Sequence, residues 1–134
     1  MTQRTEPRTD WTVWQQPEVA TKFANDRRAG IMGAEDQLTV LRQLLPKRDP
    51  KAQEVGGLDM GCGDGILLDT VLSRWQGAKG VALDGSETML QLAKQRLSCY
   101  PETDIRYLHT DFNVLDWRDA LPVSAFSAVV SGFA

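Results

Sequence analysis

The chain has 134 residues, of which 42% are hydrophobic, and a formal net charge of −3. This length suits one compact domain with its own core rather than two. Interleaved charges of both signs disfavour an obligatory nucleic-acid partner, and no apolar run approaches the roughly 20 residues of a membrane span. Two widely spaced cysteines, Cys62 and Cys99, and a polar N-terminus favour a reducing, cytoplasmic setting. The single histidine excludes a multi-histidine metal site within this chain, and we expect no metal.

The N-terminal part of the sequence predicts two helices. The first covers 16–25, with a proline in its first turn, and it ends after two arginines at a glycine. The second covers 34–45, where leucines recur at helical spacing. The polar connector 47–54 indicates a boundary. We therefore expect residues 1–50 to form an N-terminal helical extension and residues 51–134 to form the main fold.

From residue 55 onward, strands and helices alternate. The expected strands cover 55–60, 80–84, 105–110 and 126–132, and the expected helices cover 65–75 and 87–97. This alternation predicts a parallel sheet with helices on its faces.

A glycine-rich loop, within "LDMGCGDG", follows the first strand. Gly61, Gly63 and Gly65 alternate, and the carboxylates of Asp59 and Asp64 lie beside them. Glycines permit unusual backbone dihedrals and let a ligand approach the backbone at the start of a helix. A tight turn that binds nothing needs only one glycine, so three favour a ligand-binding loop.

The spacing of these glycines differs from the dinucleotide-binding pattern G-x-G-x-x-G. Counted from Gly61, the third glycine of that pattern falls at Ile66. Two carboxylates would also serve a pyrophosphate poorly, and they favour a ligand that carries a cation. A nicotinamide oxidoreductase is therefore disfavoured.

Two further strands end in acidic residues. Asp84 ends the second strand, where a carboxylate can accept hydrogen bonds from a ribose diol. Asp111 and Phe112 follow the third strand, where they can hold the edge and face of an adenine. Alternatively, Asp84 caps the next helix and Asp111 is a turn residue. The carboxyl ends of successive parallel strands form the edge where such sheets bind ligands.

The segments "VGGLDMGCGDG", "GVALDGSETMLQLAKQRL", "IRYLHTDFNVLD" and "FSAVVSGFA" resemble the first half of a class I S-adenosylmethionine-dependent methyltransferase. The resemblance implies a doubly wound, Rossmann-like α/β fold with strand order 3-2-1-4, the cofactor S-adenosylmethionine, and methyl transfer. It implies cofactor-binding roles for Asp59, Gly61, Cys62, Gly63, Gly65, Asp84, Gly85, Asp111 and Phe112. In this assignment the loop glycines line the methionine part and Asp59 lies close to its ammonium. Asp84 binds the ribose, and Asp111 and Phe112 meet the adenine.

The chain departs from the family pattern at two places. Gly85 stands where the family often has an apolar side chain against the adenine, and Gly56 and Gly57 occupy a strand that is usually more apolar. Cys62 is expected to be a small side chain packed under the loop rather than a nucleophile.

No catalytic base is assigned. His109 lies near a strand end, where a lone histidine is more often a packed or surface residue. Trp11, Trp14 and Phe23 form either a lid over the cofactor or, in the favoured interpretation, the face by which the N-terminal helices dock.

The acceptor is expected to be a small molecule, and its identity is open. Alternatives are a cofactor-binding module without catalysis and an aminopropyltransferase-like enzyme. Because the family sheet has further strands, we expect the chain to be a truncated piece of a longer methyltransferase, inactive alone. Its fourth strand would then be an exposed edge that promotes self-association.

Overall fold

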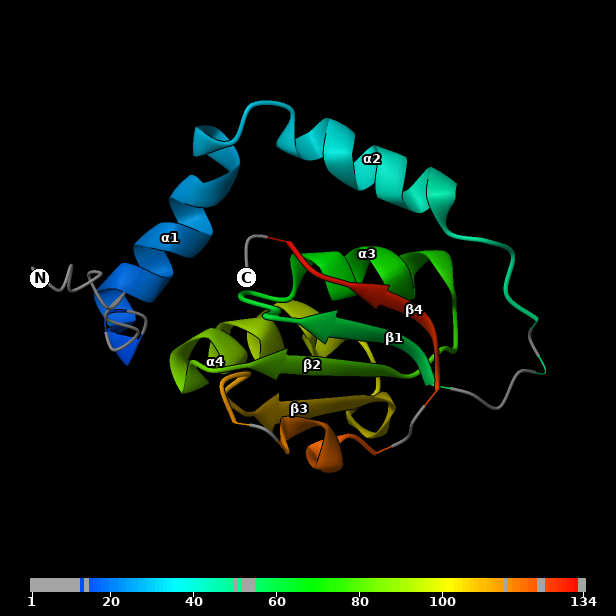
Figure 1. The fold of residues 1–134 in the computed structure, drawn as a ribbon. Coiled ribbons are helices and arrows are strands. Elements are labelled where there is room, and N and C mark those ends of the chain that lie inside the picture. Colours follow the sequence, from blue (N-terminus) through cyan, green and yellow to red (C-terminus); the bar gives the residue numbers. More distant parts are fainter. Residues whose placement is uncertain are drawn as a thin grey trace, which may run out of the picture.

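A four-stranded parallel sheet forms the centre of the computed structural model, which describes residues 13, 15–49, 51, 55–114, 116–122 and 125–132 (Figure 1). The strands are β1 (Val55–Met60), β2 (Gly80–Asp84), β3 (Ile105–His109) and β4 (Phe126–Val130). Their order is β3-β2-β1-β4, and every pairing is parallel. The predicted α/β fold and strand order are confirmed, and β4 forms one edge of the described sheet.

Two helices cover one face of this sheet: α3 (Ile66–Arg74) packs on β1, and α4 (Glu87–Arg96) packs on β2 (Figure 1). Their inward side chains, including Leu68, Val71 and Ala93, belong to one buried cluster. The Ser86 hydroxyl accepts a hydrogen bond from the Met89 amide at 3.3 Å, as expected of an N-cap. The short helices η2 (Leu97–Cys99) and η3 (Glu102–Asp104) then lead into β3.

A row of small residues lies beneath α3. Gly57 of β1 pairs with Gly80 of β2 on one side and with Ala128 of β4 on the other. A Cβ atom on Gly57 would lie 3.1 Å from Val71 Cγ1, and one on Gly80 would lie 2.9 Å from Leu68 Cδ1. The helix therefore approaches the sheet closely, which accounts physically for glycine in a strand where the family usually has larger apolar residues.

The opposite face carries a smaller cluster of Leu58, Val81 and Leu83. Trp117 and Leu121 pack against this cluster. They belong to the β3–β4 connection, which includes the short helix η4 (Trp117–Ala120). Helix η4 has no counterpart among the predicted elements.

Helices α1 (Pro17–Gly30) and α2 (Ala34–Leu44) arch over α4 and α3 (Figure 1). The Trp75 indole donates to the Pro46 carbonyl at 2.9 Å and fixes the end of α2 on the main fold. The first helix ends at Gly30, the glycine predicted to end it, and the second matches to within one residue. Neither, nor any other helix of the described residues, is long and apolar enough to cross a membrane.

The proposed boundary at residue 50 stays a prediction, because Pro50 and residues 52–54 lie outside the described residues. Trp11 and Trp14 lie outside them too, and Phe23 is half-buried on α1.

Candidate functional site

The glycine loop has left-handed backbone conformations at all three of its glycines. Gly61, Gly63 and Gly65 have φ values of 67°, 52° and 83°, a region that side chains with a Cβ rarely adopt. The amides of Gly61 and Cys62 both donate to the Leu83 carbonyl, at 2.8 and 2.9 Å. These bonds hold the loop against the carboxyl end of β2.

Asp84 connects that strand end to the loop. Its Oδ2 accepts the Gly63 amide at 2.9 Å, and its Oδ1 accepts the Ser86 amide at 2.8 Å. Asp84 thus holds the amide of Ser86, whereas the side chain that caps α4 is that of Ser86 itself. An ionised carboxylate has about four acceptor positions, and Asp84 is only partly buried. It keeps the capacity to accept hydrogen bonds from a ligand at this edge.

Asp59 lies inside the fold. Its side chain is fully buried, and its Oδ2 accepts the Leu68 amide at 3.1 Å in the first turn of α3. A carboxylate is well placed there because the N-terminus of a helix carries partial positive charge. Asp59 thus joins the end of β1 to the first turn of α3, and its predicted role near a cofactor ammonium stays a prediction.

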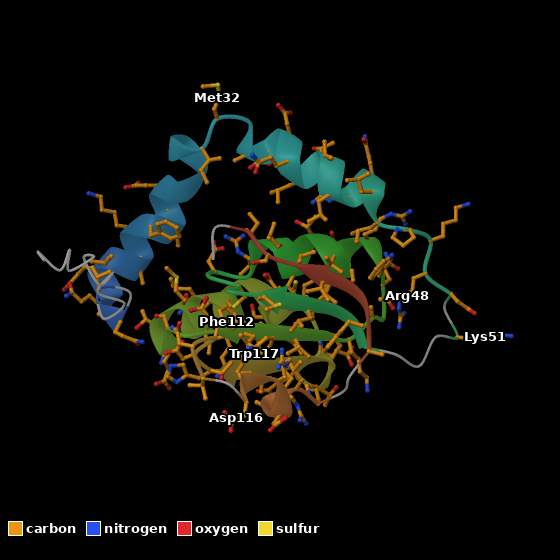
Figure 2. The ribbon with its side chains drawn as sticks, viewed as in Figure 1. Met32, Arg48, Lys51, Phe112, Asp116 and Trp117 are labelled. Carbon is orange, nitrogen blue, oxygen red and sulfur yellow. The ribbon has the colours of Figure 1, made fainter. Side chains whose placement is uncertain are left out.

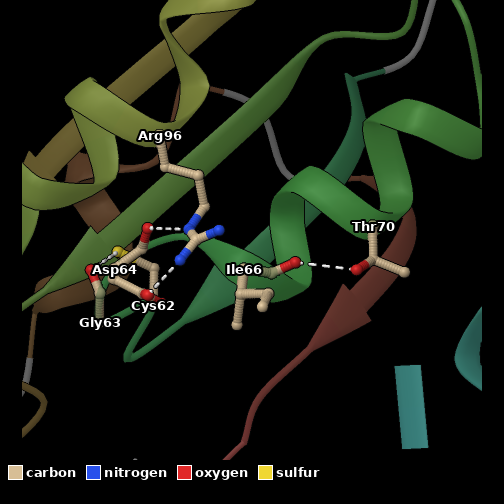
Figure 3. A network of polar contacts seen from close by, with 6 residues as sticks. All are labelled: Cys62, Gly63, Asp64, Ile66, Thr70 and Arg96. Carbon is tan, nitrogen blue, oxygen red and sulfur yellow. Dashed lines mark hydrogen bonds and ion pairs between the residues drawn. The ribbon is translucent and has the colours of Figure 1, made fainter. Parts of the chain in front are cut away.

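Asp64 forms an ion pair that the sequence analysis missed. Arg96 of α4 donates to Asp64 Oδ2 at 2.6 Å and to the Asp64 carbonyl at 3.0 Å (Figure 3). The Arg96 charge offsets that of Asp64, so only part of the negative charge assumed in the sequence analysis is available to attract a cation. No local pattern indicates this partner, because the two residues lie 32 positions apart.

Cys62 is buried in the larger core cluster. Desolvation raises the pKa of its thiol well above the ordinary range, and the nearby carboxylates of Asp59, Asp84 and Asp64 raise it further. The side chain is therefore a neutral thiol packed under the loop, as predicted. The role of Cys62 in cofactor binding stays a prediction, and its backbone amide and carbonyl already form hydrogen bonds within the fold, to the Leu83 carbonyl and from the Gly65 amide.

Gly85 brings three parts of the chain together. Its carbonyl accepts hydrogen bonds from His109 Nε2 at 3.0 Å and from Gln15 Nε2 at 2.9 Å. The Gln15 carbonyl in turn accepts the Thr88 hydroxyl at 3.1 Å. Gln15 and His109 thus both contact Gly85, the residue that follows Asp84. Sequence reasoning did not identify Gln15.

Asp111 and Phe112 occupy the end of β3 next to Asp84. The Thr110 amide donates to the Asp84 carbonyl at 3.1 Å. Asp111 Oδ1 accepts both the backbone and side-chain amides of Asn113, at 2.8 and 2.7 Å, so the turn interpretation describes its geometry. Phe112 is 38% exposed. The carboxyl ends of β1, β2 and β3 therefore gather the predicted residues along one edge.

A groove of about 340 Å³ lies on the β4 side of the loop. Its walls come from the α1–α2 turn and α2, from Ile66 and Leu67 at the start of α3, and from the end of β4. The Ser131 hydroxyl donates to the Met60 carbonyl at 2.8 Å and joins the ends of β4 and β1. Gln37 and Ser131 are the polar side chains among these described lining residues, and none of the lining side chains is charged.

Comparisons with known proteins agree with this arrangement. The family described as "Methyltransferase domain" matches residues 58–134. A curated relative, malonyl-[acyl-carrier protein] O-methyltransferase of Paenibacillus sp. (strain JDR-2), is 32% identical over 81 residues, which are 60% of this chain and 29% of that protein.

Two solved structures show the same fold. DesVI of Streptomyces venezuelae has a TM-score of 0.59 and 27% identity, covering 86% of this chain and 43% of that one. CalS10 of Micromonospora echinaspora, an amino pentose methyltransferase solved with S-adenosylmethionine bound, has a TM-score of 0.52 and 28% identity, covering 84% and 42%. The chain spans less than half the length of each of these three proteins.

Proposed function

The chain belongs to the methyltransferase-domain family, and on this premise we propose that it binds S-adenosylmethionine for methyl transfer to a small-molecule acceptor. The observation that carries the proposal is the 2.9 Å hydrogen bond from the Gly63 amide to Asp84 Oδ2. It unites the glycine loop and the acidic strand end in a single site. Ligands of open α/β sheets bind at this edge.

The described residues suit this cofactor. Asp84 retains acceptor positions for the two ribose hydroxyls, and the loop glycines present backbone for the methionine part. Phe112 offers an exposed ring to the adenine. A Cβ atom on Gly85 would meet only the Thr110 carbonyl oxygen, at 3.6 Å, so the space filled by an apolar side chain in the family is open here.

The bound cofactor supplies a methyl group that is activated by its positively charged sulfur. The protein then has to align an acceptor behind that methyl group and exclude water. No general base is assigned, because His109 Nε2 already donates to the Gly85 carbonyl.

The groove beside β4 is the proposed place for the acceptor. It lies at the boundary between β1 and β4, where the strand order reverses direction, and ligand crevices form at such switch points. Its uncharged lining favours a neutral, largely apolar acceptor, since burying a charge without a partner is costly.

Isothermal titration calorimetry tests cofactor binding. We expect the protein to bind S-adenosylhomocysteine and to show no binding of NADH. Gly63→Val should abolish binding, whereas Gly77→Val is a matched control, because Gly77 also has a positive φ, 76°, and a Cβ there meets nothing within 4 Å. Binding of NADH without binding of S-adenosylhomocysteine would favour the oxidoreductase alternative.

A labelled-methyl assay with neutral acceptors tests the chemistry. Transfer of label supports a methyltransferase. Cofactor binding without transfer by any form of the protein favours a binding module, and preference for decarboxylated S-adenosylmethionine favours an aminopropyltransferase. The expectation that the chain is one piece of a longer enzyme stays a prediction.

A further inference from the structure

Phe112 and Trp117 form an aromatic pair on the β3–β4 connection (Figure 2). Their ring centroids lie 5.4 Å apart, and the rings meet edge to face at 75°. Such pairs prefer this geometry because the positive edge of one ring meets the negative face of the other. The pair thus restricts the orientation of the Phe112 ring.

The two rings differ in how firmly they are held. Trp117 packs against the buried cluster of Leu58, Val81 and Leu83 beneath the sheet. The guanidinium of Arg118 lies 5.8 Å from the centroid of its ring, within cation–π range. Phe112, by contrast, is 38% exposed. Trp117 is therefore the fixed partner, and Phe112 is the partner available to a ligand.

The exposed ring lies at the edge that carries the candidate site. It follows Asp111 directly, and the end of β3 is joined to β2 by the hydrogen bond from the Thr110 amide to the Asp84 carbonyl. Under the proposed function, on which this inference rests, the adenine of the cofactor lies beside Phe112. Stacking of a base on an aromatic ring depends on the orientation of that ring.

We propose that Trp117 is a positioning residue for the adenine: it fixes the angle of the Phe112 ring and thereby sets the preference for ligands that carry the base. Trp117 itself needs no contact with the cofactor. Its effect should pass through Phe112 and should be confined to the adenine part of the ligand.

Two ligands isolate this effect. S-adenosylhomocysteine carries the adenine, and S-ribosylhomocysteine has a hydroxyl in its place while keeping the ribose and the amino acid. The quantity measured by calorimetry is the ratio of their dissociation constants. Trp117→Leu should reduce the preference for S-adenosylhomocysteine roughly three- to tenfold, because a misoriented Phe112 ring loses part of the stacking energy of the base. Trp117→Phe keeps an aromatic edge and should recover part of the preference.

A double-mutant cycle tests whether Trp117 acts through Phe112. Phe112→Leu should reduce the ratio at least as much as Trp117→Leu, and the double variant should be no worse than Phe112→Leu alone. Val114→Ala, a change at a 48% exposed position of the same connection, should leave the ratio unchanged. Circular dichroism identifies any variant that fails to fold, and Trp117→Phe then serves as the test.

An unchanged ratio in a folded Trp117 variant, or independent effects of the two substitutions, would overturn this inference while the proposed function stands. If the parent protein binds neither ligand, both fail together. If it binds both ligands equally, cofactor binding at this edge stands, but the protein does not contact the adenine there, and the positioning role of Trp117 is excluded.

Discussion

Replacing Gly65 by alanine should destabilise the protein through two separate effects. Its φ is 83°, and forcing a residue with a Cβ into the left-handed region costs about 1–2 kcal/mol. The added Cβ would also lie 3.2 Å from Ala93 Cβ and 3.2 Å from Leu97 Cδ1. Both neighbours are buried, and overpacking a core costs about 1–3 kcal/mol. We therefore expect Gly65→Ala to lower the free energy of unfolding by about 2–5 kcal/mol.

Gly77→Ala separates the two effects. Gly77 has a similar φ of 76°, but a Cβ there meets nothing within 4 Å. Both variants also lose the same backbone freedom in the unfolded chain, so that contribution cancels in their difference. Urea unfolding, followed by tryptophan fluorescence, should show Gly65→Ala to be less stable than Gly77→Ala by about 1–3 kcal/mol. Equal free energies of unfolding would refute close packing of the loop on α4.

Three other predictions concern the same region. Asp84→Asn should weaken binding of S-adenosylhomocysteine by about tenfold or more and lower the free energy of unfolding by about 1–3 kcal/mol, because one amide oxygen cannot replace both carboxylate oxygens. Calorimetry measures the first effect and urea unfolding the second. Unchanged affinity would exclude the assignment of Asp84 to the ribose. Gly85→Ala should leave the free energy of unfolding within about 0.5 kcal/mol of that of the parent protein, because a Cβ there makes one ordinary contact, at 3.6 Å. A larger loss in the same urea assay would show that the space beside Gly85 is not open. The raised pKa of Cys62 means that the folded chain keeps the thiol proton above the ordinary value of 9.0, where the unfolded chain loses it. The contribution of the buried thiol to the free energy of unfolding is therefore fully present below pH 9.0 and should fall by roughly 1 kcal/mol per pH unit above it. Urea unfolding across this range should show a smaller fall in Cys62→Ala, and an equal fall would contradict the burial of the thiol.

Local sequence patterns predicted most of the fold. Periodic apolar residues and the Ser86 cap marked the main helices, and the short apolar runs marked the four strands. The short helix η4 in the β3–β4 connection was not predicted, because a single helical turn around Trp117 is too short to show a periodic pattern of apolar residues. Its position depends instead on burial of the indole against Leu58, Val81 and Leu83, which no local pattern encodes.

The roles predicted for the candidate-site residues stay predictions, but their arrangement in the fold can be compared with the sequence pattern. Asp84 and the glycines lie together, as expected of successive strand ends. The same pattern could not show that Asp59 is buried, that Arg96 pairs with Asp64, or that Gly65 packs on α4. Each of these facts depends on how closely helices approach the sheet, which is set by side-chain volumes far apart in the sequence.

The small residues beneath α3 couple distant positions of the chain. Leu68 occupies space left by both Gly57 and Gly80, with its Cδ1 3.4 Å and 2.9 Å from their ideal Cβ positions. A larger residue at position 80 therefore requires a shorter one at position 68, whereas the nearest neighbour of a Cβ at position 57 is Val71 Cγ1, at 3.1 Å. Among descendants of this sequence, position 80 should covary with position 68 and position 57 with position 71: Gly80→Ala should be inherited together with Leu68→Val. Shared volume, rather than the identity of any one residue, is what natural selection would conserve there.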